Sequence, residues 1–186
     1  MKHIRCSAAS IALTASISGI LIGYTTAVIA GALEFLNQDF KLTTWEEGFI
    51  VSIILIGAFI GASVSGLIVN RHGQKSALIM TAILFTISTS LTVIAPNEHL
   101  LIVFRFTLGL AIGMLSMMAP LYIAETSVAK WRGTLVSCFQ LMITLGIFFG
   151  YLSAYMLHNY HSCRILFAIA IIPSIFFGDY TRCLSS

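Results

Sequence analysis

Two polar side chains lie inside membrane-length apolar runs in the middle of this chain. Arg105 falls in one run and Gln140 in the next. An ionised side chain in hydrocarbon costs at least about 2.5–3.5 kcal/mol, so an arginine there usually faces a cavity or a partner. The Gln140 amide offers two donors and an acceptor, which suit a hydroxyl-bearing solute. These residues indicate a polytopic transporter.

Each of these side chains also has a structural explanation. Gln140 could make a hydrogen bond between helices, and Arg105 could extend its head group to the outer membrane surface. Between the two runs lies a hinge with the spacing Glu125-x6-Arg132-Gly133. A surface ion pair contributes only about 0–1 kcal/mol, so stability is a poor explanation for this pair of charges.

The elements that must position these residues are apolar segments near the ~20 residues that span a bilayer. Irregular backbone cannot lie in lipid, so each segment is expected to be a helix. The sequence therefore predicts an all-α integral membrane protein, a six-transmembrane-helix bundle over residues 1–178 with a short cytoplasmic tail over 179–186. The expected spans are Ala8–Leu33, Phe49–Val69, Ser76–Ala95, Leu100–Ile123, Leu135–Leu157 and Ile165–Gly178.

Composition excludes several other classes of protein. Only 9% of the residues are charged, against roughly 25% in soluble domains, and the mean hydropathy is +0.97. The net charge of +3 is not arranged as a nucleic-acid-binding patch. The four cysteines have no metal-ligand spacing, and the spans hold no catalytic constellation. We therefore expect no enzyme activity, no catalytic residue, no metal site and no cofactor.

Basic residues predict the orientation, because cytoplasmic loops carry an excess of Lys and Arg. A cytoplasmic N-terminus leaves only Lys41 and Arg164 outside. Both termini are then cytoplasmic, in what we expect to be a bacterial inner membrane. The residues placed inside are Lys2, Arg5, Arg71, Lys75, Lys130, Arg132 and Arg182.

Small residues recur every four positions on several of the predicted helices. This spacing lets two helix backbones approach closely where lipid supplies no hydrophobic drive for association. It predicts a packed bundle and says nothing of activity. The residues are Gly19, Gly23, Ala27 and Gly31 on the first helix, Gly57, Gly61 and Ser65 on the second, Gly109 and Gly113 on the fourth, and Gly146 and Gly150 on the fifth.

Three motifs resemble those of the sugar porters of the major facilitator superfamily. Gly23-Tyr24-Thr25-Thr26-Ala27-Val28-Ile29 is similar to G-Y-(D/N)-T-x-V-I. The stretch 66–75, GLIVNRHGQK, is similar to G-x-x-x-D-R-x-G-R-(R/K). The stretch 105–140 resembles R-x-x-x-G-x-x-x-G, then P-x-Y-x-x-E-x6-R-G, then Q. The resemblance covers roughly residues 19–177 and matches the N-terminal half of that fold.

The resemblance implies a role for each candidate residue. Gln140 would contact a monosaccharide, and Arg105 would pair with a first-helix carboxylate in proton-coupled members. Arg71 and Lys75 would join a charge network that closes the cytoplasmic gate, although they could also be topology-setting charges alone. Glu125 and Arg132 would hold the cytoplasmic side closed when the transporter faces outward. The glycines 66 and 73 would serve close helix approach and a tight turn.

Departures from the motifs bear on coupling and on the gate. Thr25 stands where proton-coupled sugar porters have aspartate, and threonine cannot titrate. Asn70 and Gln74 replace an aspartate and an arginine, which removes charge from the gate.

The final residues, DYTRCLSS, lack the expected P-E-S-P-R motif. We therefore expect one half of a transporter, which needs a C-terminal half or a second copy as its partner. Its other partners would be a monosaccharide and membrane lipid, with no nucleic acid. The alternative is a membrane remnant or interaction protein that transports nothing.

Overall fold

The computed structural model describes residues 16–29, 43–95 and 97–157, and all of its regular structure in these ranges is helical. The predicted sixth span and the tail lie outside the described residues. So do both chain termini, whose orientation stays a prediction. The described helices are Ser16–Ile29, here called the first helix, and α2 (Thr44–His72), α3 (Gln74–Ile94), α4 (Glu98–Thr126) and α5 (Arg132–Leu157).

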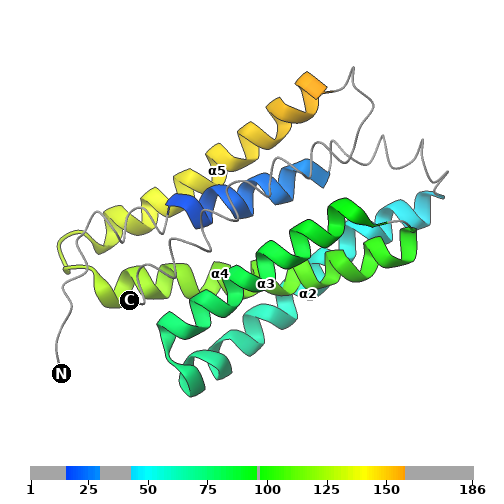
Figure 1. Ribbon diagram of the computed structural model, residues 1–186. Helices are drawn as coiled ribbons and strands as arrows, with labels where there is room; N and C mark the ends of the chain where they lie inside the picture. The colour runs from blue at the N-terminus through cyan, green and yellow to red at the C-terminus, as the bar shows by residue number, and fades with distance from the viewer. Residues whose placement is uncertain (1–15, 30–42, 96, 158–186) are drawn as a thin grey trace.

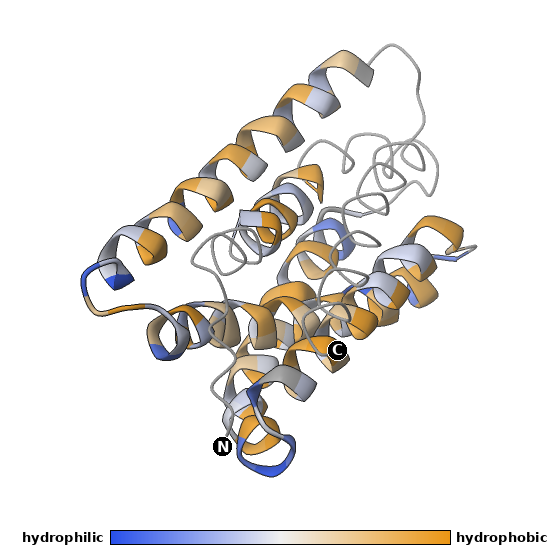
Figure 2. Cartoon of the chain, turned by 60° about the vertical axis from the view of Figure 1, so that its left-hand side comes forward, coloured by the Kyte–Doolittle hydropathy of each residue, from blue (hydrophilic) through white to orange (hydrophobic). Residues whose placement is uncertain are grey.

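Four of the described helices, α2 to α5, are long and apolar enough to cross a membrane. Apolar residues run along these helices (Figure 2), and many of their large apolar side chains are exposed, as lipid requires. Each begins two to five residues before the apolar segment predicted from sequence. Hydropathy marks the part of a helix that lies in hydrocarbon, whereas the helix itself continues into the polar interface until a cap or a glycine ends it.

The ends of α2 show two such signals. At its start, the Glu46 carboxylate accepts hydrogen bonds from the backbone N–H of Thr43 at 2.7 Å and from its hydroxyl at 2.8 Å. This is one arm of a capping box. At its end, Gly73 has φ +78° and ψ 157°, a conformation that only glycine adopts readily. Gly73 thus forms the tight turn predicted between α2 and α3.

Among the helices α2 to α5, the pair α2 and α4 makes the most extensive contact. Glycines on each helix lie directly against backbone atoms of the other, so a Cβ at any of them would collide with a carbonyl group. The contacts are reciprocal, which means that both backbones meet along one seam. The pairs are Gly57 with Phe106, Gly61 with Leu110, Gly109 with Ile54, and Gly113 with Ala58.

A second glycine seam joins the first helix to α5. A Cβ on Gly19 would lie 2.8 Å from the carbonyl oxygen of Phe139, and Gly23 contacts the Ile143 carbonyl group. In return, Gly146 contacts the carbonyl group of Ile20. These two seams confirm the close packing predicted from the four-residue spacing. Figure 1 shows the first helix running along α5.

Helix α3 packs on α4 and completes the core. The core includes Phe85 of α3 and Leu115 of α4, and Leu21 joins it from the first helix. Buried threonines on α3 donate their hydroxyl hydrogens to carbonyl oxygens one turn earlier, as Thr89 does to Phe85 at 2.8 Å. Hydroxyls satisfied in this way can be buried in an apolar interface without an unpaired donor.

The prediction for Gly66 differs from the structure. No described atom lies within 4 Å of a Cβ built at Gly66, and the residue is exposed. The close approach in α2 occurs at Gly57 and Gly61 instead. Gly66 is therefore outside the seam although it shares the same helix.

This difference supplies a matched test within α2. Gly61→Ala should lower the unfolding free energy by about 1–3 kcal/mol, because the added methyl group would overpack the seam at Leu110. Gly66→Ala should leave it unchanged or raise it by up to about 1 kcal/mol, since alanine favours a helix over glycine. The measurement is thermal unfolding of the purified protein in detergent. Equal melting temperatures for the two variants would contradict the seam.

Candidate functional site

Arg105 is enclosed by the helix bundle. Its side chain is only 1% exposed and is among the largest fully buried ones. It lies one turn before Gly109 on α4, and seven residues after Glu98, which is about 10 Å along the helix axis. Such burial does not fit a side chain that extends to the membrane surface. The protein has therefore built an environment for a permanent positive charge at this depth.

Thr25, on the first helix, is also buried, with 6% of its surface exposed. Its hydroxyl donates to the carbonyl oxygen of Leu21 at 2.7 Å and lies 3.1 Å from that of Ile22. The hydroxyl is therefore satisfied by its own helix. It has no charge to offer Arg105, whatever the conformation of the bundle.

Gln140 lies on an exposed face of α5. It follows Arg132 by eight residues, about 12 Å along the axis, whereas half of a hydrocarbon core is about 15 Å. Its side-chain amide makes no hydrogen bond to any described residue, so the hydrogen bond to another helix is not found in that part of the chain. Its backbone oxygen accepts from Thr144 at 3.2 Å. The amide is thus exposed and makes no hydrogen bond within the described residues.

The end of the bundle where α3 begins and α4 ends carries a contact that the sequence analysis did not predict. With its amide nitrogen facing Glu125, Gln74 donates to Glu125 Oε2 at 2.6 Å, and its oxygen accepts from the Tyr122 backbone N–H at 3.0 Å. This orientation satisfies both ends of the amide. Gln74 thus joins the first turn of α3 to the last turn of α4.

The other gate candidates lie at the same end of the bundle. Arg71 is exposed in the last turn of α2, and the Lys75 backbone lies in the first turn of α3, with its side chain outside the description. Arg132 begins α5, and its Nε donates to the Ser127 carbonyl oxygen at 3.2 Å. Within the described ranges no ion pair joins Glu125 to Arg132. The structure brings the four residues to one end but pairs Glu125 with Gln74.

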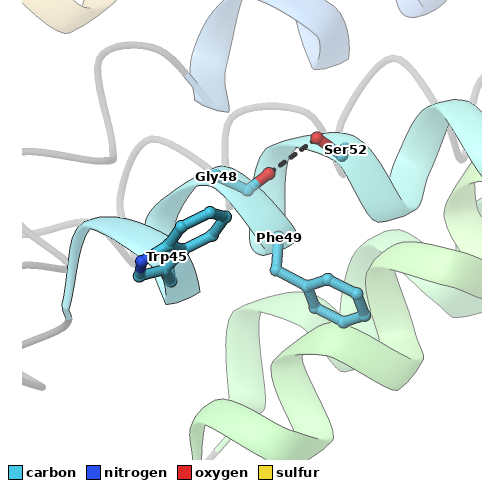
Figure 3. A pocket seen from close by; sticks show the side chains of 4 residues that line it. All are labelled: Trp45, Gly48, Phe49 and Ser52. Atoms are coloured by element: carbon cyan, nitrogen blue, oxygen red, sulfur yellow. Dashed lines mark hydrogen bonds between the residues drawn. The ribbon is translucent and has the colours of Figure 1, made fainter.

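A hollow of about 490 Å³ near the start of α2 is a poor candidate for solute binding. Its described lining consists of Trp45, Gly48, Phe49 and Ser52, all from α2. The Ser52 hydroxyl donates to the Gly48 carbonyl oxygen at 2.7 Å (Figure 3). No cluster of metal-ligating side chains occurs in the described ranges.

The fold and motifs can now be compared with known proteins. The sequence pattern of the family described as "Sugar (and other) transporter" matches residues 11–178. This chain belongs to that family. The match confirms the resemblance seen in the three motifs, and it makes the chain an integral membrane protein related to transporters and not to enzymes.

Individual relatives agree. The galactose-proton symporter of Escherichia coli is 40% identical over 161 residues, which cover 87% of this chain and 35% of that protein. Probable inositol transporter 2 of Arabidopsis thaliana is 45% identical over 145 residues, 76% of this chain and 25% of that protein. The chain thus spans about a third or less of the length of these curated relatives.

Solved structures confirm the fold. The proton:xylose symporter of the major facilitator superfamily, bound to 6-bromo-6-deoxy-D-glucose, superposes with a TM-score of 0.85 at 30% identity, covering 94% of this chain and 44% of that one. The inward-open xylose transporter of Escherichia coli gives 0.83 at 32% identity, with 94% and 47% coverage. The bundle corresponds to about half of the major facilitator fold.

The Gln74–Glu125 contact predicts a charge effect at the gate. Gln74→Glu keeps the side-chain shape but removes the donor and sets two carboxylates against each other. We expect the unfolding free energy to fall by about 1–2 kcal/mol, read as a lower melting temperature in detergent. The control, Asn70→Asp, adds the same charge at an exposed site in the last turn of α2 and should change stability by less than about 0.5 kcal/mol. If both variants melt together, Gln74 does not hold α3 to α4 through Glu125.

Proposed function

We propose that this chain forms the N-terminal half of a monosaccharide transporter that works by alternating access. The observation that carries the proposal is the exposed side-chain amide of Gln140 on α5, which makes no hydrogen bond to any described residue, in a chain of the sugar transporter family. Transporters of this kind bind substrate near the midplane, at the interface of two repeats. Gln140 would supply hydrogen bonds from one side, and a second six-helix half would supply the rest.

The same proposal specifies the membrane in which the protein lies and the side on which its loops lie. Lys and Arg gather on the loops joining α2 to α3 and α4 to α5, which we place on the cytoplasmic side of a bacterial inner membrane with both chain termini. The contact between Gln74 and Glu125 then lies at the cytoplasmic gate. Arg71, Lys75 and Arg132 would supply its positive charge toward the second half.

We further propose that transport by this half is not coupled to protons at Thr25. Coupling needs a group that gains and loses a proton during the cycle. The Thr25 hydroxyl does not titrate, and it is hydrogen-bonded within its own helix. Arg105 would remain positive in every state. Sugar would then move down its own gradient.

A chimera tests the proposal. Residues 1–178 replace the matching N-terminal half of the Escherichia coli galactose-proton symporter, their 40%-identical relative. We expect saturable galactose uptake in vesicles. Gln140→Ala should raise KM about 2- to 12-fold, because one hydrogen bond contributes about 0.5–1.5 kcal/mol.

Ser137→Ala is the control, an exposed hydroxyl on the same helix that makes no hydrogen bond to a described residue. It should leave KM unchanged. Monodisperse elution and an unchanged melting temperature establish that each variant is folded. A folded chimera without uptake would overturn the transport function and favour a membrane interaction protein. An unchanged KM in Gln140→Ala would remove Gln140 from the sugar site.

A further inference from the structure

The hinge between α4 and α5, residues 127–132, exposes apolar and basic side chains together. Val128 is 70% exposed and Trp131 is 52% exposed. Lys130 and Arg132 are exposed beside them. An exposed tryptophan next to two cations is unusual for a loop that contacts water alone. It suits a surface that is apolar on one side and charged on the other.

Lys130 and Trp131 act as one unit. The Lys130 Nζ lies 5.9 Å from the centroid of the Trp131 ring, within the range of a cation–π contact. The ammonium group is thus held over the indole face. A single ligand could therefore contact the ammonium group and the aromatic ring together.

Hydrogen bonds hold the hinge in this shape. The Ser127 backbone N–H donates to the Ile123 carbonyl oxygen at 3.0 Å, and that of Trp131 donates to Val128 at 2.9 Å. The Nε of Arg132 donates to the Ser127 carbonyl oxygen at 3.2 Å. Its two amino groups make no hydrogen bond to described residues. Because the hinge is already ordered, a ligand does not have to order it on binding.

The position of the hinge between two membrane spans indicates which kind of ligand it meets. The hinge directly follows the apolar span 99–126, and its last residue begins the span 132–156, so it lies where hydrocarbon gives way to head groups. Tryptophan concentrates in that layer. The second tryptophan of the chain, Trp45, begins α2 at the other end of the bundle (Figure 1), beside the carboxylates of Glu46 and Glu47. The two tryptophans have opposite electrostatic surroundings.

We propose that the 127–132 hinge binds the head group of an anionic phospholipid. Trp131 and Val128 insert at the level of the glycerol backbone, beside the ester-linked ends of the acyl chains. Lys130 binds the phosphate, with a charge complementary to it. The surface does not depend on the sugar site, so it holds whether or not the chain transports sugar.

Tryptophan quenching tests this on the full chain. Trp45→Phe leaves Trp131 as the one tryptophan, and Trp131→Phe leaves Trp45. Each protein is reconstituted in vesicles of equal parts phosphatidylcholine and phosphatidylglycerol, with brominated chains on one lipid or the other. Trp131 should select phosphatidylglycerol roughly fivefold, the effect of one basic side chain near a charged surface. Trp45 should show no such preference.

Substitutions at Lys130 separate a local site from general surface charge. In the Trp45→Phe background, Lys130→Gln should bring the preference of Trp131 down to that of Trp45, and Lys130→Arg should retain it. Lys130 is exposed, so both variants should fold, as an unchanged melting temperature would establish. The proposal is overturned if Trp131 prefers phosphatidylglycerol no more than Trp45 does, if Lys130→Gln keeps the preference, or if brominated lipid does not quench Trp131.

Discussion

Contact between bare helix backbones is the constraint on which this structure depends. Lipid is as apolar as leucine, so burial of apolar side chains does not drive helices together inside a membrane. Close packing must do so, and here glycines allow it along two seams, one between α2 and α4 and one between the first helix and α5. Each seam is reciprocal, which fixes both the crossing point and the rotation of the two helices.

The seams also place the functional residues. Arg105 lies one turn before Gly109, so the contact of α4 with α2 carries the arginine into the bundle. On α5, Phe139 and Ile143 meet the first helix, and Gln140 projects from a neighbouring, exposed face. Thr25, two residues after Gly23 on the first helix, is also buried. The positions of the seam glycines therefore explain why Arg105 is buried and why Gln140 is exposed.

Sequence periodicity predicted the seams, because four-residue spacing is a local property that one helix displays by itself. It could not show which helix each glycine meets. The close approach expected at Gly66 came from the loop motif and not from the spacing, and it was wrong. The Gln74–Glu125 contact was missed because it joins residues far apart in the chain. The replaced arginine was a signal, although it predicted lost charge and not a neutral hydrogen bond to the same carboxylate.

The central claim is that a half with this fold carries no proton site at Thr25. The most direct measurement is sugar-induced proton movement, recorded as external pH in a lightly buffered suspension of vesicles that contain the chimera with the Escherichia coli symporter. Adding galactose should leave the pH unchanged with Thr25 and should raise it with Thr25→Asp, which gives Arg105 a counter-charge that titrates. Alkalinisation with Thr25 intact, matching that of the parent symporter, would contradict the account.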